Sequence, residues 1–415
     1  MIKNKNLLVV FLTICSISVF AQESKTTFKL YGFSRSDFYS DTRKMNASVL
    51  DLFSFYPTYK DLNADGEDLN ALSSAGLSSI TTRMGLDFST SAGIFGSKTA
   101  VAKIETDFGG SPTYMLLRIR QAYTQILWDK SALLVGQTWH PMFVTATQPN
   151  VLSLNTGSPF QPFNRSPQIR YDYQMNNVKL TAAAIYQMMY TSQGPEGGSS
   201  TYQKNAMLPD LYVSLEYKKN HLLVGLGGDY KSILPERYIT DGTSVKHVNH
   251  NTLNTPAIMG YGVYTNGKLA IKAKAIFGQN LVEHSIIGGY AITPKNEYIP
   301  YNSFTSFIHF NYGTTHQLGL LLGYSANLGP SKTIIGNSNF YGFGVANANT
   351  SNVKMVGNMF RITPTYSYNI KNWRMGVELE YTNAAWGNRS ATNGEILHLD
   401  RTSNYRIYAI LMYKF

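Results

Sequence analysis

Apolar and polar residues alternate along most of the chain with a period of two residues. Between residues 80 and 88, Met84, Leu86 and Phe88 take one set of alternate positions, whereas Arg83 and Asp87 take the other. A period of two places successive side chains on opposite faces of a β-strand, so the pattern predicts strands with one apolar and one polar face. The alternation recurs in sixteen segments, at about residues 27–41, 79–90, 98–108, 116–128, 131–140, 168–175, 178–190, 210–218, 221–232, 256–265, 268–278, 303–312, 316–325, 355–369, 373–383 and 404–415.

The connections between these segments alternate in length. Asn176-Asn177 and Asn266-Gly267 have the chemistry of tight hairpins. Long connections lie between the hairpins, at about 42–78, 141–167, 191–209, 233–255, 279–302, 326–354 and 384–403. Strands can cross a bilayer only in a closed barrel, because lipid offers no hydrogen-bond partner to a sheet edge. The sequence therefore predicts an all-β fold, a transmembrane antiparallel β-barrel of sixteen strands with short periplasmic turns and long extracellular loops.

The first twenty-one residues have the pattern of a cleaved signal peptide. Lys3 and Lys5 give a positive start, residues 7–20 are mostly apolar, and Ala21 suits a cleavage site. We therefore expect residues 22–415 to form the mature protein, as a single barrel domain in the outer membrane of a bacterium. A soluble β-sandwich is the alternative for the alternating strands, and it is disfavoured by this export signal.

The last segment carries an unbroken apolar row. Alternate residues from Tyr405 to Phe415 are apolar or aromatic, and the row ends on the C-terminal phenylalanine. This arrangement resembles the terminal signal that the barrel-assembly machinery recognises in outer-membrane proteins. We expect that machinery to be one partner of the chain, and outer-membrane lipid and lipopolysaccharide to be others.

Composition and charge narrow the possible functions. Of the 415 residues 43% are hydrophobic and only 15% are charged, with 36 basic against 25 acidic side chains. The basic residues are spread singly along alternating segments, whereas a nucleic-acid binder concentrates them in runs or modules. Nucleic acid is therefore not an expected partner, and the charges instead suit a water-filled lumen.

Motifs for catalysis and for cofactors are weak. No histidine is followed by a serine at the spacing that an outer-membrane phospholipase needs, and His247 and His250 have no neighbouring ligand pattern. The acidic stretch around Asp65 lacks the closing glutamate of a calcium loop. The sequence predicts neither an enzyme nor a cofactor nor a metal site.

Several segments resemble the DcaP-like outer-membrane porins. They are residues 30–37 (LYGFSRSD), 82–86 (TRMGL), 103–108 (KIETDF), 117–123 (LRIRQAY) and 134–139 (LVGQTW). Residues 20–22 (FAQ) and 155–163 (NTGSPFQPF) look like the Bacteroidetes branch of that family. The resemblance implies a sixteen-stranded homotrimeric diffusion channel, and some members prefer small organic anions.

A long loop at about residues 141–167 follows the fifth predicted strand. In general porins the loop at this place folds into the barrel, and we expect the same here by analogy. Arg165 would then lie near Arg118, Arg120 and Arg170 and face acidic residues of the wall. The residues predicted to line the pore or its constriction are Arg35, Arg83, Lys103, Glu105, Asp107, Arg118, Arg120, Arg165, Arg170, Asp172, Arg361 and Arg374.

Two classes of function remain open from the sequence. The first is a porin for small hydrophilic solutes that prefers small organic anions, because grouped guanidinium groups attract anions and bind carboxylates with a planar fork. The second is a surface-exposed structural or adhesion barrel with a narrow or plugged lumen. Within the first class one alternative stays open, in which the arginines only pair with Glu105, Asp107 and Asp172 and stiffen the wall, which leaves an unspecific pore.

Overall fold

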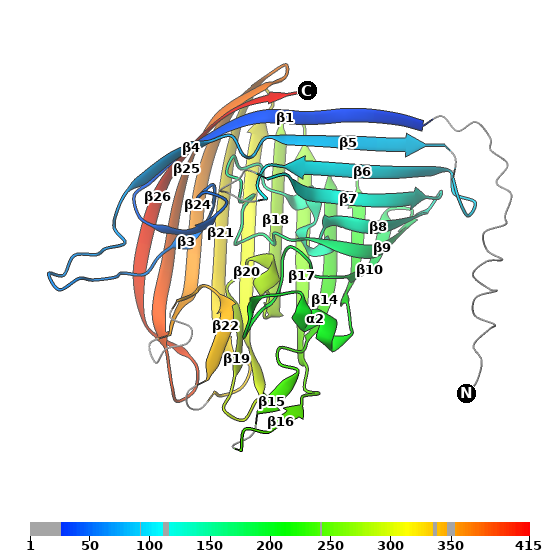
Figure 1. Cartoon of the computed structure of the whole chain (residues 1–415). Helices are drawn as coiled ribbons and strands as arrows, with labels where there is room; N and C mark the ends of the chain where they lie inside the picture. Colours follow the sequence, from blue (N-terminus) through cyan, green and yellow to red (C-terminus); the bar gives the residue numbers. More distant parts are fainter. Residues whose placement is uncertain (1–25, 92, 111–115, 241–242, 335–337, 347–352) are drawn as a thin grey trace, which may run out of the picture.

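The computed structural model describes residues 26–415 except 92, 111–115, 241–242, 335–337 and 347–352. The predicted signal peptide, residues 1–21, lies outside the described residues. Within the described ranges the chain forms one closed antiparallel barrel of sixteen strands, which confirms the predicted fold class (Figure 1).

The barrel closes because the first strand pairs with the last. Phe33–Asp41 of β1 pairs with residues 406–414 of β26, and the start of β1 pairs with β5 on its other side. The strands of the wall, in order around the barrel, are β1 (Thr26–Asp41), β5 (Arg83–Thr90), β6 (Thr99–Asp107), β7 (Arg118–Leu127), β8 (Ser131–Trp139), β9 (Arg165–Met175), β10 (Val178–Ile185), β13 (Asp210–Lys219), β14 (Leu222–Ile233), β17 (Leu253–Asn266), β18 (Leu269–Gln279), β20 (Tyr298–Gly313), β21 (His316–Pro330), β24 (Lys354–Ile370), β25 (Trp373–Arg389) and β26 (Ile396–Lys414).

Shorter elements lie in the connections. β4 (Ser74–Ser78) precedes β5 and pairs with the end of β1. The others are β2 (Met45–Ser48), β3 (Phe53–Pro57), β11 (Gln193–Gly194), β12 (Gly197–Gly198), β15 (Tyr238–Thr240), β16 (Lys246–Val248), β19 (Gly288–Ile292), β22 (Asn339–Phe343), β23 (Val345–Ala346), the helix α2 (Thr201–Ala206), and the 3-10 helices η2 (Pro141–Phe143), η3 (Thr145–Thr147) and η4 (Val282–His284). In the part of the chain that the structure describes, no helix has the length and apolar character needed to cross a membrane.

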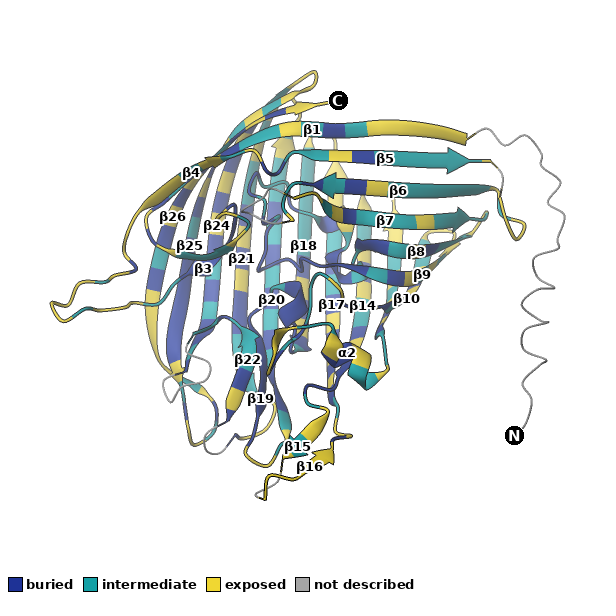
Figure 2. Cartoon of the chain, in the orientation of Figure 1, coloured by how far each residue is buried: buried dark blue, intermediate teal, exposed yellow. Residues whose placement is uncertain are grey.

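Side chains alternate between the inside and the outside of the wall as the sequence pattern predicts. On β26, Arg406 and Tyr408 are buried inside the barrel, whereas Ile407 and Leu411 on the outer face are 54% and 49% exposed. Figure 2 shows the same alternation as bands of buried and exposed positions along the strands. The row that ends at Phe415 therefore faces outward, and the backbone of Phe415 exchanges two hydrogen bonds with Gly32 of β1.

The connections differ at the two ends of the barrel. Asn176, Asn220 and Gly267 take the positive φ angles that tight hairpins require, at 51°, 50° and 57°. The predicted connection at 384–403 is wrong, because β25 runs to Arg389 and β26 begins at Ile396. Strand pairing continues there through pairs such as Ala385↔Arg401, where the alternation of apolar residues has already ended.

The wall is not equally tall all round. The strands β5 to β10 have 8–11 residues each, whereas β20, β21, β24, β25 and β26 have 15–19. A tilted strand needs about nine to eleven residues to cross a bilayer, so the wall from β5 to β10 is only just tall enough. We refer to β5–β10 as the short wall.

Two connections fold into the barrel, namely residues 45–57 and residues 140–164, and we call them the inner loops. Phe53 and Phe55 of the first pack with Phe160 and Phe163 of the second in one buried cluster against β20, β21, β24 and β25. Gly323 leaves room for this approach, since a Cβ atom there would lie 2.4 Å from the ring of Phe160. Residues 42–78 were predicted as an external loop, and part of that segment lies inside because its aromatic residues find an apolar partner there.

Candidate functional site

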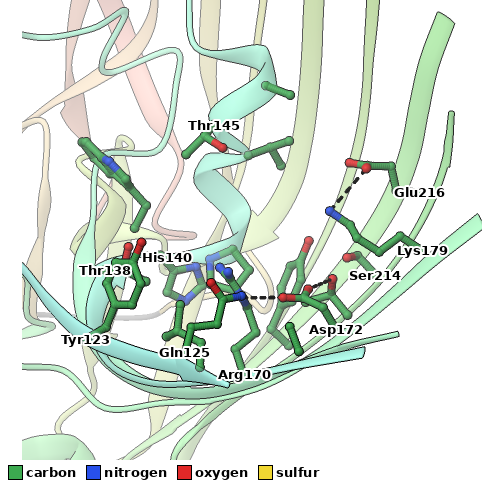
Figure 3. A pocket seen from close by; sticks show the side chains of 18 of the residues that line it. Tyr123, Gln125, Thr138, His140, Thr145, Arg170, Asp172, Lys179, Ser214 and Glu216 are labelled. Atoms are coloured by element: carbon green, nitrogen blue, oxygen red, sulfur yellow. Dashed lines mark hydrogen bonds and ion pairs between the residues drawn. The ribbon is translucent and has the colours of Figure 1, made fainter. Parts of the chain in front are cut away.

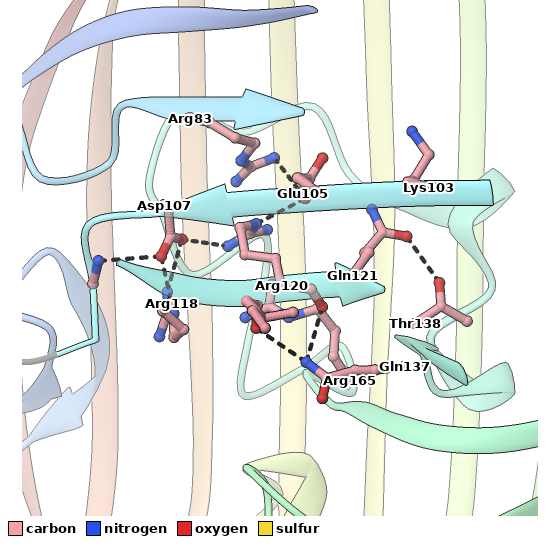
Figure 4. Close-up of polar contacts among 12 residues, drawn as sticks. Arg83, Lys103, Glu105, Asp107, Arg118, Arg120, Gln121, Gln137, Thr138 and Arg165 are labelled. Carbon is pink, nitrogen blue, oxygen red and sulfur yellow. Dashed lines mark hydrogen bonds and ion pairs between the residues drawn. The ribbon is translucent and has the colours of Figure 1, made fainter. Parts of the chain in front are cut away.

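The inner face of the short wall carries a group of four arginines and two carboxylates, which we call the arginine ladder. It consists of Arg83, Glu105, Asp107, Arg118, Arg120 and Arg165. Antiparallel register sets Asp107 opposite Arg83 on one side and opposite Arg118 on the other. Since inward positions repeat every second residue, the charged side chains of β5, β6 and β7 meet on one surface (Figure 4).

Ion pairs within the ladder are close. The guanidinium of Arg118 binds both oxygens of Asp107, with Nε–Oδ1 and Nη2–Oδ2 distances of 3.0 and 2.8 Å. Arg120 donates from Nε to Glu105 at 2.9 Å and from Nη1 to Asp107 at 2.8 Å, and Arg83 lies 3.8 Å from Glu105. Four guanidinium groups thus face two carboxylates, and the ladder keeps a surplus of two positive charges.

Arg165 is the most enclosed member of the ladder. Its side chain is fully buried, its guanidinium lies 4.8 Å from the ring centre of Trp139 and 5.1 Å from that of Phe163, and Nη2 donates to the hydroxyl of Tyr190 at 2.7 Å. Among the described residues neither Nε nor Nη1 has a hydrogen-bond partner. The sequence placed Arg165 in the loop, but it opens β9, because Trp139 pairs with it across the sheet.

Arg170 does not join the ladder, although the sequence analysis grouped it with Arg165. It lies five residues further along β9, and a rise of about 3.3 Å per residue separates the two by roughly 16 Å. Arg170 pairs with Asp172 at 3.1 Å beside a cavity of about 480 Å³ (Figure 3). Lys179 and Glu216 form a second ion pair, at 3.3 Å, on the same cavity.

Lys103 also lies outside the ladder. Its ammonium group pairs with Asp87 at 2.7 Å and donates to the hydroxyl of Tyr31 at 2.9 Å. The site residues predicted on β6 therefore divide between two surroundings, because Lys103 lies at the middle of the strand, opposite Asp87, and Asp107 lies at its end.

Three further predicted residues hold the inner loops to the wall. Arg35 donates to the carbonyl of Leu152 at 2.6 Å, and Arg374 donates to Asn150 at 2.9 Å. Arg361 is buried beneath both inner loops, where it donates to carbonyl groups of each and lies 3.2 Å from Glu380. Arg361 therefore has no open water beside it and acts as an anchor.

Some residues of the site were missed by sequence reasoning. Phe53 and Phe55 face the ladder from the first inner loop. The sequence feature that could have predicted their position is the cluster of aromatic residues in a segment that was expected to be an external loop. A second buried polar group, which joins the residue after β8 to β13, β14 and η4, was missed as well. It contains His140, Asp210, Asp229, Lys231, Glu283 and His284. In the described ranges no group of three or more such side chains is arranged to hold a metal ion.

The second buried group fastens the start of one inner loop. The rings of His140 and His284 lie 4.6 Å apart, His140 Nε2 lies 3.7 Å from Asp229, and Lys231 pairs with Glu283 at 2.5 Å. Burial lowers the pKa of His140 well below its usual range, and His284 adds repulsion. Burial also lowers the pKa of His284 to about 3, with further repulsion from Lys231 and Lys274.

Acid is expected to destabilise the barrel through these two histidines. The pKa values of both histidines are lower in the folded state than in the unfolded state. Their contribution to the free energy of unfolding is therefore fully present above a pH of about 6.5, and it is lost as the pH decreases below that value. The loss is at most about 1.4 kcal/mol per pH unit for each histidine. Urea unfolding of refolded protein between pH 7.5 and 4.5 measures the slope.

His284→Gln should flatten that slope, whereas the exposed His250→Gln should not. The groups that face the two histidines are Asp229, Glu283, Lys231 and Lys274. An unchanged slope in His284→Gln would mean that the acidic groups of the barrel set its pH dependence.

Comparisons with known proteins agree with the fold. No family model matches the sequence, and no curated protein sequence matches it. Among solved structures, the outer membrane channel DcaP of Acinetobacter baumannii matches with a TM-score of 0.67 and 17% identity, over 94% of this chain and 97% of that chain. OmpT, an outer membrane protein of Vibrio cholerae, matches with a TM-score of 0.53 and 11% identity, over 94% of this chain and 98% of that chain. OmpF of Salmonella typhi, in complex with daunomycin, matches with a TM-score of 0.53 and 11% identity, over 94% of this chain and 97% of that chain. The chain thus has the architecture of outer-membrane porins and channels.

Proposed function

We propose that the protein is an outer-membrane porin through which small hydrophilic solutes diffuse, with a preference for small organic anions. The observation that carries the proposal is the arginine ladder. Its surplus of two positive charges lies on the inner face of the short wall, opposite the apolar inner loops. Charges placed beside a narrow aqueous path raise the local concentration of ions of the opposite sign.

The ladder suits anions even though its arginines are paired. Asp107 and Glu105 each bind two guanidinium groups, so the two carboxylates hold the arginines in fixed positions without neutralising all of them. A guanidinium group that is held in place loses less freedom when it binds a further carboxylate. The pairing expected for a merely stiffened wall is therefore compatible with anion recognition.

The outer surface supports a place in the outer membrane. Large apolar side chains are exposed around the outside of the wall, among them Leu226 and Ile258. Lipid would cover this surface, with the tight turns on the periplasmic side and lipopolysaccharide around the long loops. The outward row that ends at Phe415 fits recognition by the barrel-assembly machinery. We include in this proposal that the chain is a member of the DcaP-like family and of its Bacteroidetes branch.

A plugged structural or adhesion barrel is the second candidate, and the inner loops favour it. Their aromatic residues pack inside the barrel against β20, β21, β24 and β25. Planar-bilayer recordings of the intact protein under a potassium chloride gradient decide between the two candidates. We expect discrete channels whose reversal potential has the sign of chloride preference. Absence of channels would favour the plugged barrel, and cation preference would reject the role given to the ladder.

We also propose a homotrimer that is formed through the short wall. The short wall is only just tall enough to cross a bilayer, so burial against neighbouring copies would shield it from lipid. Ala182 on β10 faces outward there, and its small side chain permits close packing.

Mass measurement in mild detergent should give three copies, and Ala182→Trp should shift the protein toward monomer. Ala409→Trp, on the outer face of β26, is the matched control and should leave the trimer intact. A wild-type monomer at all workable concentrations would contradict the proposal.

A further inference from the structure

We propose that the arginine ladder is one half of a binding site for short-chain alkyl monocarboxylates, and that the aromatic side chains of the inner loops form the other half. The inference rests on the proposed function and names the solute class that the same site selects. It concerns a small cavity between the ladder and the inner loops, with a volume of about 90 Å³.

The polar half of the cavity offers unused hydrogen-bond donors. Arg118 and Arg120 both line it. Their bonds to Asp107 and Glu105 use Nε and Nη2 of Arg118 and Nε and Nη1 of Arg120. The other terminal nitrogen of each guanidinium has no acceptor among the residues that the structure covers, so its N–H groups are available to a carboxylate.

Tyr190 supplies a third donor. It lines the cavity, and its hydroxyl oxygen accepts a hydrogen bond from Arg165 at 2.7 Å. The hydroxyl proton is therefore directed away from Arg165, and it has no described acceptor. A carboxylate in the cavity would accept from this hydroxyl and from the two guanidinium groups, while the unpaired charge of Arg165 lies close behind.

The other half of the cavity is apolar. Val49, Phe53, Phe55, Leu154 and Phe163 line it beside two serines, Ser48 and Ser285, and the ring of Phe53 lies 4.6 Å from that of Phe163 in an edge-to-face contact. A second carboxylate or a sugar hydroxyl placed against the phenylalanine rings would lose hydration, and the rings offer it no hydrogen-bond partner, which is unfavourable. An alkyl chain would instead bury apolar surface. The cavity thus discriminates against dicarboxylates of similar length.

Cavity size limits the apolar group. An apolar cavity of about 150 Å³ holds benzene, and the present one has about 90 Å³. Chains of a few carbons therefore fit better than a phenyl ring. The side chain of Arg118 is 15% exposed, so the polar side of the cavity is in contact with solvent.

Block of the chloride current by added carboxylates tests the inference. For single channels in planar bilayers, affinity should rise from acetate through propionate to butyrate by about fourfold per methylene. Succinate should bind more weakly than butyrate. Saturation-transfer NMR on the protein in detergent gives the same comparison without relying on conduction, so a failure of binding is distinguished from a failure of channel function.

Two variants examine the two halves of the site. Leu154→Asn replaces an apolar lining by a polar one of similar size, and should reduce the gain per methylene to nearly none. Tyr190→Phe should weaken all monocarboxylates by a similar factor of about ten, through loss of a hydrogen bond to a charged group. Leu69→Asn, at an exposed leucine of a loop, is the control and should change neither quantity. Equal affinities for acetate and butyrate, or tighter binding of succinate, would overturn the inference and leave anion selectivity untouched.

Discussion

Replacing Arg118 and Arg120 together by alanine is expected to abolish the anion preference that we propose for the channel. The two substitutions remove the surplus of positive charge from the arginine ladder, because Arg83 and Arg165 then face Glu105 and Asp107 alone. Each lost charge contributes about 1 kcal/mol to an ion that passes within about 4 Å in water-like surroundings, or roughly fivefold in permeability ratio. Reversal potentials in a salt gradient measure the change, which should be largest at low salt because ions screen the field.

A matched variant separates net charge from the loss of ion pairs. Arg118→Gln, Arg120→Gln, Glu105→Gln and Asp107→Asn combined remove two positive and two negative charges, so the surplus carried by Arg83 and Arg165 remains. We expect this variant to keep an anion preference that the double alanine variant lacks. Arg401→Ala, outside the lumen, should behave like the wild type. An unchanged reversal potential in the double alanine variant would leave an unselective pore.

Replacing Arg361 by alanine is expected to free both inner loops and to increase single-channel conductance. This guanidinium donates to the carbonyl groups of Phe55 and Ser158, which belong to different inner loops, at 2.6 and 2.8 Å. The substitution leaves Glu380 buried without its cation, and breaking a buried pair on one side destabilises by about 3–5 kcal/mol. Conductance and its noise in planar bilayers, together with urea unfolding, measure the two effects.

The paired substitution Arg361→Met with Glu380→Gln provides the control. It removes both charges and keeps the side-chain volume, so most of the lost stability should return. The carbonyl groups of the inner loops would still lack their donor, and the conductance should therefore remain above that of the wild type. If the single variant conducted like the wild type, the aromatic cluster alone would be sufficient to hold the inner loops in place.

These two experiments probe opposite sides of the lumen. The short wall presents the ladder, whereas the tall wall from β20 to β26 holds the inner loops through Arg361 and through Glu378, which accepts from the backbone of Leu152 at 2.5 Å. If the inner loops narrow the lumen from the tall wall, they set its width, while the arginine ladder on the short wall keeps its position. Selectivity and conductance should then respond to different substitutions.

The sequence by itself determined the barrel and the orientation of its side chains. Alternation with a period of two settles which residues face in and which face out, since it depends only on neighbours along one strand. It placed Arg118 and Arg120 on the inner face and the row ending at Phe415 on the outer face, and the tight turns followed from asparagine and glycine at positive φ. Ladder members on β5, β6 and β7 could be grouped because these strands are consecutive.

The tertiary structure decided everything that depends on contacts between distant segments. Arg361 meets Ser158 across 203 residues, and Arg35 meets Leu152 across 117, and no local pattern encodes such pairs. The inward course of residues 45–57 follows from aromatic side chains that find partners only inside the closed barrel. The place of Arg165 depends on the register of β8 against β9, which changes a loop residue into a strand residue. His140 and His284 come together because two separate loops pack against each other, and there burial and the repulsion of neighbouring cations lower their pKa values.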